Sequence, residues 1–220
     1  MKPHLKIDIV SDVVCPWCAI GLEGVQQALT QLGDSVSAEL HFKPFELNPQ
    51  MGPQGQDITE HLVEKYGSTP EQMDAAREGI RARGAALGFT FNMQRRGRIY
   101  NTFDAHRLLH WAAEIDASGK QQIALKWALM KAYFTDGENP SDAVTLVRIA
   151  ERVRLDATLA REVLSSGRYA DAVRAEEQFY LQQGIHSVPA VIVNDRHLIS
   201  GGQPPEAFAQ AFRQIAAGVA

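Results

Sequence analysis

Apolar and polar residues alternate in two short segments near the start of the chain. Over residues 5–10 (LKIDIV) and 37–45 (SAELHFKPF), the alternation has the two-residue period of a β-strand. Between them, apolar side chains recur every three or four residues over about residues 17–32. This is the spacing of an amphipathic helix, and Gly33 follows as a helix stop. The first part of the chain is therefore predicted to form a strand, a helix and a second strand.

The middle of the chain has helical periodicity throughout. A segment rich in proline and glycine at residues 49–55 (PQMGPQG) marks the boundary before it. The sequences TPE at 69–71 and PSD at 140–142 are typical helix starts, with a polar cap or an early acidic residue. The predicted helices cover residues 58–66, 70–87, 102–118, 120–134, 142–153, 157–165 and 169–183.

Strand character returns only near the end of the chain. Residues 188–194 (VPAVIVN) and 197–200 (HLIS) are predicted to form two strands, with a tight hairpin turn at 194–196 (NDR) between them. An amphipathic helix over about residues 205–217 follows. The end of the chain thus contributes a hairpin and a last helix.

Neither end of the chain has enough apolar strand to bury a core alone. We therefore expect residues 1–56 and 168–220 to share one sheet in an α/β domain of roughly 100 residues, interrupted by an all-helical insertion at residues 57–167. A length of 220 residues suits one domain with a large insertion. Hydrophobic residues make up 45% of the chain and charged residues 22%, so we expect a folded rather than a disordered protein.

The charge balance argues against several kinds of partner. The chain has 22 Lys and Arg against 26 Asp and Glu, a net charge of −4. A protein that binds nucleic acid or an anionic membrane surface is expected to be basic. No apolar run approaches the roughly 20 residues of a membrane-spanning helix. Residues 1–10 also lack the apolar core of a signal peptide. We expect a cytoplasmic protein with no nucleic-acid or membrane partner.

Cys15 and Cys18 are the two cysteines of the chain, and they lie at the predicted junction of the first strand and the first helix. A disulfide between them would close a very small loop and stabilise the fold little, so chemistry explains the pair better. The start of a helix favours a thiolate. Pro16 suits the first helical turn, because proline has no backbone N–H and none is needed there. We assign Cys15 as the exposed nucleophile and Cys18, one turn along, as the resolving thiol.

Other interpretations of the cysteine pair remain open. The pair could be half of a zinc site, although a closed zinc site usually needs four Cys or His ligands and the chain has no second cysteine pair. It could also consist of two inert buried thiols. His106 and His110 are four residues apart on a predicted helix, but no third ligand is evident, so we expect no metal site there.

Short motifs with distinctive residues occur in a fixed order along most of the chain. They are DVVCPWC at 12–18 followed by IG at 20–21, NTFDAHR at 101–107, AYF at 132–134, SVP at 187–189 and GGQ at 201–203. Together they resemble the FrnE-like group of DsbA-family thiol–disulfide oxidoreductases, in the thioredoxin superfamily. The resemblance implies a thioredoxin-like fold interrupted by a large helical insertion (DsbA-like) and a redox-active CXXC centre.

The resemblance also implies which residues hold the substrate. Pro189 matches a proline that follows a cis peptide bond and faces the cysteines, which would turn the backbone of Val188 towards a substrate strand. From the residues alone, Pro189 could equally be a trans proline at a strand start. Pro16 and Trp17 complete the expected substrate-binding set. Because Trp17 supplies no positive charge where DsbA itself has a histidine, we expect a mostly reduced pair that works as a reductase or isomerase.

The leading hypothesis is a protein-disulfide oxidoreductase or isomerase that acts on protein or small-molecule disulfides, as a monomer or homodimer. It needs no bound cofactor, and glutathione is a candidate electron donor or co-substrate. A similar fold is found in kappa-class glutathione transferases and 2-hydroxychromene-2-carboxylate isomerases, which tend to have serine where Cys15 stands, and these form the alternative enzyme class. A non-catalytic alternative is a binding or chaperone module, or a dimer bridged by metal through the cysteines.

Further residues carry weaker signals. The basic run at 95–98 (RRGR) is typical of a solvated loop, with recognition of a carboxylate as the other interpretation. Tyr133 and Phe134 are candidates to line the groove above the cysteines. Trp111 and Trp127 lie on predicted helices with apolar neighbours and are interpreted as core residues.

Overall fold

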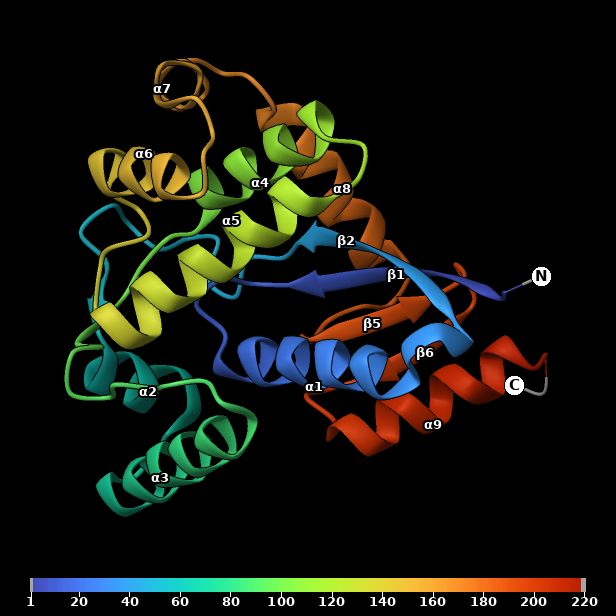
Figure 1. The fold of residues 1–220 in the computed structure, drawn as a ribbon. Helices are drawn as coiled ribbons and strands as arrows, with labels where there is room; N and C mark the ends of the chain where they lie inside the picture. The colour runs from blue at the N-terminus through green and yellow to red at the C-terminus, as the bar shows by residue number, and fades with distance from the viewer. Residues whose placement is uncertain (1, 219–220) are drawn as a thin grey trace.

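A mixed four-stranded sheet lies at the centre of the computed structural model, which describes residues 2–218. The strand order is β2–β1–β5–β6 (Figure 1). β1 (His4–Ser11) runs parallel to β2 (Ser37–Pro44), whereas β5 (Ala190–Val193) pairs antiparallel with both β1 and β6 (His197–Ser200). Strands from the two ends of the chain therefore build one sheet, as predicted.

The hairpin between β5 and β6 forms where the sequence predicts it. Asn194 and Asp195 have φ angles of 53° and 55°, in the left-handed region that Asn and Asp adopt more readily than most residues. β5 begins at Ala190, two residues later than predicted. The preceding Pro189 has no N–H to donate to a neighbouring strand, which disfavours strand pairing at that position.

Helices cover both faces of this sheet. α1 (Pro16–Leu32) and α9 (Pro205–Ala216) pack together on one face (Figure 1). α8 (Ala170–Gln182) covers the other face, where its Tyr180 packs with Val10 of β1. Because β1 is enclosed from both sides, six of its eight residues are buried instead of alternating between buried and exposed.

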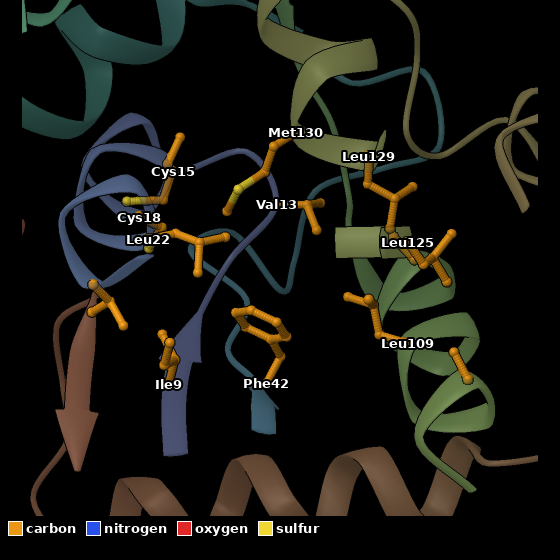
Figure 2. Packing of buried hydrophobic residues seen from close by; sticks show 14 of the residues in the cluster. Ile9, Val13, Cys15, Cys18, Leu22, Phe42, Leu109, Leu125, Leu129 and Met130 are labelled. Atoms are coloured by element: carbon orange, nitrogen blue, oxygen red, sulfur yellow. The ribbon is translucent and has the colours of Figure 1, made fainter. Parts of the chain in front are cut away.

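α4 (Phe103–Ile115) and α5 (Lys120–Lys131) lie along the edge strand β2. Figure 2 shows Ile9 and Phe42 from the sheet in one apolar cluster with side chains of these helices, among them Leu109 and Leu125. The core of the sheet is thus continuous with the core of the insertion. Trp111 belongs to this core as predicted, whereas Trp127 packs against it while only partly buried.

Polar side chains start the helices of the middle segment, which explains why their bounds were predictable. The carboxylate of Asp57 accepts from Thr59 N at 2.8 Å at the start of α2 (Ile58–Tyr66). At the start of α3 (Pro70–Leu87), Thr69 and the side chain of Gln72 form a capping box. Carboxylates also cap the two helices that follow α5, namely α6 (Ala143–Arg152) and α7 (Ala157–Ser165).

The insertion departs from an all-helical segment at two places. A two-stranded ribbon, β3 (Gln56–Asp57) with β4 (Arg98–Ile99), joins its beginning to the loop after α3. The predicted helix 120–134 is α-helical only to Lys131 and continues as a π-helical turn over Ala132–Asp136. A strand of two residues is too short to show an alternating pattern of apolar and polar residues, so the sequence could not predict the ribbon.

Candidate active site

Cys15 and Cys18 lie at the start of α1. Cys15 is the N-terminal cap of the helix, Pro16 is its first residue, and Cys15 O accepts from Cys18 N at 3.1 Å. Figure 2 shows the two cysteine side chains next to each other at this end of the helix. Both are free thiols. The local sequence therefore places one thiol at the positive end of the helix dipole and the second one turn along, as predicted.

The prediction that Cys15 is exposed is wrong. The residue is 3% exposed and Cys18 is 1% exposed. Cys15 is covered because its Sγ lies 3.8 Å from the carbonyl oxygen of Val188, in the loop that precedes β5. Cys15 nevertheless borders a large cavity, so a molecule that enters the cavity can approach its side chain.

The loop that covers Cys15 has the conformation that the resemblance implies. The Val188–Pro189 peptide bond is cis. α1 packs directly on this loop through Gly21, where a Cβ atom would lie 2.9 Å from the Cγ of Pro189 and 3.3 Å from the Cα of Gly202. Segments from three separate parts of the sequence thus meet at the cysteine pair.

Trp17 is the most exposed residue of the CPWC motif. It is 38% exposed, and the guanidinium of Arg83 in α3 lies 4.9 Å from the centre of its ring. This cation–π contact connects the start of α1 to a helix of the insertion. Trp17, Pro16, Cys15 and Val188 all border the same cavity, whereas Pro189 is buried behind them.

A buried group of charged side chains lies behind the cysteines, and sequence analysis missed it. Asp12, just before the cysteine motif, accepts from Leu47 N at 2.8 Å, and its carboxylate lies 3.6 Å from Nε2 of His106. Burial would raise the pKa of Asp12, but the hydrogen bond and charge of His106, the Leu47 N–H and the charge of Lys126 together hold it below its usual value. A charged Asp12 is therefore compensated by basic neighbours.

Lys126 of α5 is the least expected member of this group. It is fully buried, and its Nζ donates to the carbonyl oxygen of Ser11 at 3.3 Å. Burial lowers its pKa to about 8, even though the charges of Cys18, Asp12 and Cys15 act in the opposite direction. The sequence signal for Lys126 was its position on the apolar face of α5, in line with the buried residues Gln122 and Leu129.

The resolving position has its own electrostatic environment. Burial, followed by the hydrogen bond and charge of Cys15, raises the pKa of Cys18 well above its usual value. The charge of Lys126 acts against this rise. Lys126 is thus a buried positive charge that favours the thiolate of the second cysteine.

The two candidate histidines do not share a site. His106 contacts Asp12 and the Phe45 carbonyl, whereas His110 lies between Glu114 and Glu176, so the two histidines have different partners. No group of three or more His, Cys, Asp or Glu side chains in the described part of the chain could hold a metal ion.

The prediction that Tyr133 and Phe134 line the groove is wrong. Both are buried in the core, and neither borders the cavity at Cys15. The arginines of the basic run at 95–98 lie in different surroundings. Arg96 borders the cavity, whereas Arg98 donates to the carbonyls of Gln54 and Gly55.

The sheet order, the helix that starts at a CXXC pair and the cis-proline loop beside it define a thioredoxin-like protein with a DsbA-type insertion. The chain matches the DSBA-like thioredoxin domain family over residues 6–213 and belongs to that family. Within the described residues, no helix is both long enough and apolar enough to cross a membrane.

The chain is also similar to one curated protein and to several solved structures. A probable DsbA oxidoreductase from Streptomyces coelicolor is 34% identical, with a TM-score of 0.89 over 98% of this chain and 91% of that one. YwbO of Bacillus subtilis (strain 168), an uncharacterised protein, is 26% identical over 96% of each chain. The cytosolic disulfide reductase DsbM from Pseudomonas aeruginosa, solved with GSH, shares the fold at 12% identity, with a TM-score of 0.63 over 96% of this chain and 99% of that one.

Proposed function

We propose that the protein is a thiol–disulfide oxidoreductase that reduces or isomerises disulfides through Cys15 and Cys18. The observation that carries the proposal is the placement of Cys15. Cys15 is the N-terminal cap residue of α1, its Sγ lies 3.8 Å from the Val188 carbonyl oxygen, and the residue borders a cavity, with Cys18 one helical turn away. Membership of the DSBA-like thioredoxin domain family supports the same chemistry.

The proposed reaction has two exchange steps. The thiolate of Cys15 attacks one sulfur of a substrate disulfide, so that a mixed disulfide forms and the other substrate sulfur leaves as a thiolate that takes up a proton. The thiolate of Cys18 then attacks Sγ of Cys15 and releases the remaining substrate thiol. The substrate gains two electrons and two protons, and the cysteine pair becomes a disulfide. A thiol donor returns the pair to the reduced form, and glutathione is the candidate for that donor.

Four further residues are proposed to bind the substrate, three of them by direct contact and Pro189 through the loop that carries Val188. Val188 would pair its backbone with an extended substrate segment, with Pro189 holding that loop in place. Pro16 and Trp17 would form the wall on the other side of Cys15. The support for these roles is their position around the thiol, since Val188, Pro16 and Trp17 border the cavity at Cys15.

We also propose a division of labour within the chain. Residues 1–56 and 168–220 would form the catalytic domain, and residues 57–167 would cover the cavity. A cytoplasmic site of action fits the cysteine usage, because the chain has no cysteines beyond the CXXC pair and so has no framework of structural disulfides.

The decisive test compares the wild type with Cys15→Ser and Cys18→Ser in the reduction of insulin and of small disulfides. We expect Cys15→Ser to be inactive, and we expect Cys18→Ser to accumulate mixed disulfides through Cys15 that are visible by mass spectrometry. Equal disulfide reduction by the wild type and Cys15→Ser would refute the proposal. A glutathione-dependent transferase or isomerase activity that survives Cys15→Ser would favour the alternative enzyme class.

A further inference from the structure

The cavity beside Cys15 has the size of a small-molecule site. Its volume is about 620 Å³, within the range of about 300–1,000 Å³ that is usual for ligand pockets. It lies between the start of α1 and the helices α2 and α3 of the insertion. Its apolar wall includes Leu62, Met73, Ile80, Met93 and Ile99.

The charged side chains that border this cavity are mostly basic. They are Glu46, Lys65, Arg77 and Arg96. The single carboxylate, Glu46, is already bound by Asn101 at 3.0 Å and by Arg174. Arg77 is paired with Asp74 at 3.1 Å. Lys65 and Arg96 therefore determine the net charge that an entering molecule meets.

Neither Lys65 nor Arg96 has an acidic partner within salt-bridge distance among residues 2–218. Nζ of Lys65 donates to two neutral acceptors, the Leu47 carbonyl at 2.8 Å and Oδ1 of Asn48 at 2.7 Å. Nε of Arg96 donates to the hydroxyl of Tyr133 at 3.0 Å. The terminal nitrogens of Arg96 have no hydrogen-bond acceptor within the same described residues, so they can bind a ligand.

Packing holds the guanidinium of Arg96 in place. Its centre lies 5.2 Å from the ring centre of Tyr133 and 5.1 Å from that of Phe134, two buried residues of the π-helical turn. A cation positioned by aromatic rings loses less conformational freedom when it binds an anion than a freely moving side chain does.

The positive charges of Lys65 and Arg96 affect the ionisation of a histidine in the cavity wall. His61, which also borders the cavity, lies near them. Burial, followed by the charge of Lys65 and opposed by Glu64, lowers the pKa of His61, and Arg96 adds to the lowering. The lowered pKa favours the neutral form of His61, so Lys65 and Arg96 remain the cations that matter at this wall.

We propose that the cavity binds a small disulfide that carries carboxylate groups, with Lys65 and Arg96 as the carboxylate-binding residues and the disulfide held at Cys15. This inference rests on the proposed oxidoreductase function and names its substrate class. The apolar wall holds the uncharged part of the molecule, and the two cations select for negative charge. Charge-assisted hydrogen bonds of this kind are among the stronger polar contacts in proteins.

The reaction balances as a two-step exchange. The substrate disulfide R–S–S–R takes two electrons and two protons and becomes two R–SH molecules. The thiols of Cys15 and Cys18 lose them and form one disulfide. A single turnover of the reduced protein therefore needs no further reductant, and the substrate preference can be measured without knowing the physiological electron donor.

The test uses single turnovers of the reduced protein with three disulfides that differ in charge: anionic 3,3′-dithiodipropionate, neutral bis(2-hydroxyethyl) disulfide and cationic cystamine. Each rate constant is divided by that of dithiothreitol with the same disulfide, which removes intrinsic differences in reactivity. We expect the normalised rate to be at least about tenfold higher for the anionic than for the neutral compound, and lowest for cystamine.

Variants then assign the preference to the two cations. Lys65→Gln and Arg96→Gln should each lower the anionic-to-neutral ratio several-fold while the rate with the neutral disulfide stays close to wild type. Arg96→Lys, which keeps the charge, should retain part of the preference. Lys120→Gln, the same loss of charge at an exposed residue away from the cavity, is the matched control and should change nothing.

The possible failures are distinguishable. If none of the three disulfides reacts faster with the wild-type protein than with Cys15→Ser, the proposed function itself is wrong. If all three disulfides react at similar normalised rates, or if Lys65→Gln lowers all three rates by the same factor, only the carboxylate site is refuted. Because Lys65 is exposed, its variant is expected to fold even if Arg96→Gln does not.

Discussion

At the scale of single residues, the resolving step is the electrostatically difficult one. Cys18 must become a thiolate in order to attack, yet burial raises its pKa well above the usual value. The charge of Lys126 opposes this effect, and this lysine comes from α5 of the insertion rather than from the sheet. A lysine in a fully buried position is unfavourable for folding, which suggests that its charge serves the second thiol.

Replacement of Lys126 by methionine tests this role. Without the positive charge, the pKa of Cys18 should rise further, because the thiolate loses its stabilising neighbour. The measurement is the ultraviolet absorbance of the thiolate against pH, in a Cys15→Ser background. Lys131→Met removes the same charge from an exposed position on the same helix and should leave the titration where it was. An unchanged titration in Lys126→Met would show that the lysine has no influence on Cys18.

At the scale of elements, α1 packs closely against the C-terminal segment at two glycines, Gly21 and Gly24. A Cβ atom at Gly24 would lie 2.6 Å from the Gln203 carbonyl and 3.1 Å from the ring of Phe208. Gly24→Ala should therefore push α1 away from α9 and reduce the free energy of unfolding by about 1–3 kcal/mol, measured by urea denaturation.

The matched control is Gly79→Ala in α3, where a Cβ would meet nothing within 4 Å. There the better helix propensity of alanine should increase stability by up to about 1 kcal/mol. Opposite signs for two glycine-to-alanine changes in helices would attribute the effect at Gly24 to packing. If both variants were stabilised, the close approach of α1 to the C-terminal segment would be wrong.

A second element-scale contact ties α5 to the sheet. The side-chain amide of Gln122 accepts from Phe42 N at 2.9 Å and donates to Phe42 O at 3.0 Å. It therefore satisfies the two backbone groups of Phe42 that a neighbouring strand would otherwise bind at this edge of β2. Gln122→Leu would leave both backbone groups unpaired in a buried place and should cost about 2–4 kcal/mol of unfolding free energy. Gln182→Leu, at an exposed site on α8, should change stability by less than about 0.5 kcal/mol.

The sequence predicted elements well wherever a local signal exists. Bounds of α2, α3 and α7 agree with the pattern because periodicity and polar caps act within a few residues. The same holds for the cysteine pair, which is a local motif. The burial of Cys15 was missed because it depends on Val188, far along the chain. Lys65 and Arg96 come from separate segments, so only the folded chain shows that they border one cavity.

At the scale of the whole molecule, Lys126 couples stability to pH. Its usual pKa is 10.5 and its pKa in the fold is about 8. Between these values the unfolded chain binds a proton that the folded protein does not bind, so stability decreases as the pH falls from 10.5 towards 8. Below pH 8 both states are protonated, and the full cost of the buried charge persists. Above 10.5 both are neutral and the cost is absent.

Lys126→Met should remove this cost. We expect the variant to be more stable than its parent below pH 8, with a pH-dependent part of about 3 kcal/mol because each pKa unit corresponds to about 1.4 kcal/mol. This advantage should shrink as the pH rises towards 10.5. Both proteins carry serine at positions 15 and 18, so that titration of Cys18 does not contribute, and the other titrating groups largely cancel in the difference. Because the charges of the two cysteines raise the pKa of Lys126, the serine background lowers it further, and the figure of about 3 kcal/mol is a minimum. Urea unfolding over a series of pH values measures it. A constant difference between parent and variant would mean that the ammonium is no worse solvated in the fold than in water, and the lowered pKa of Lys126 would then be wrong.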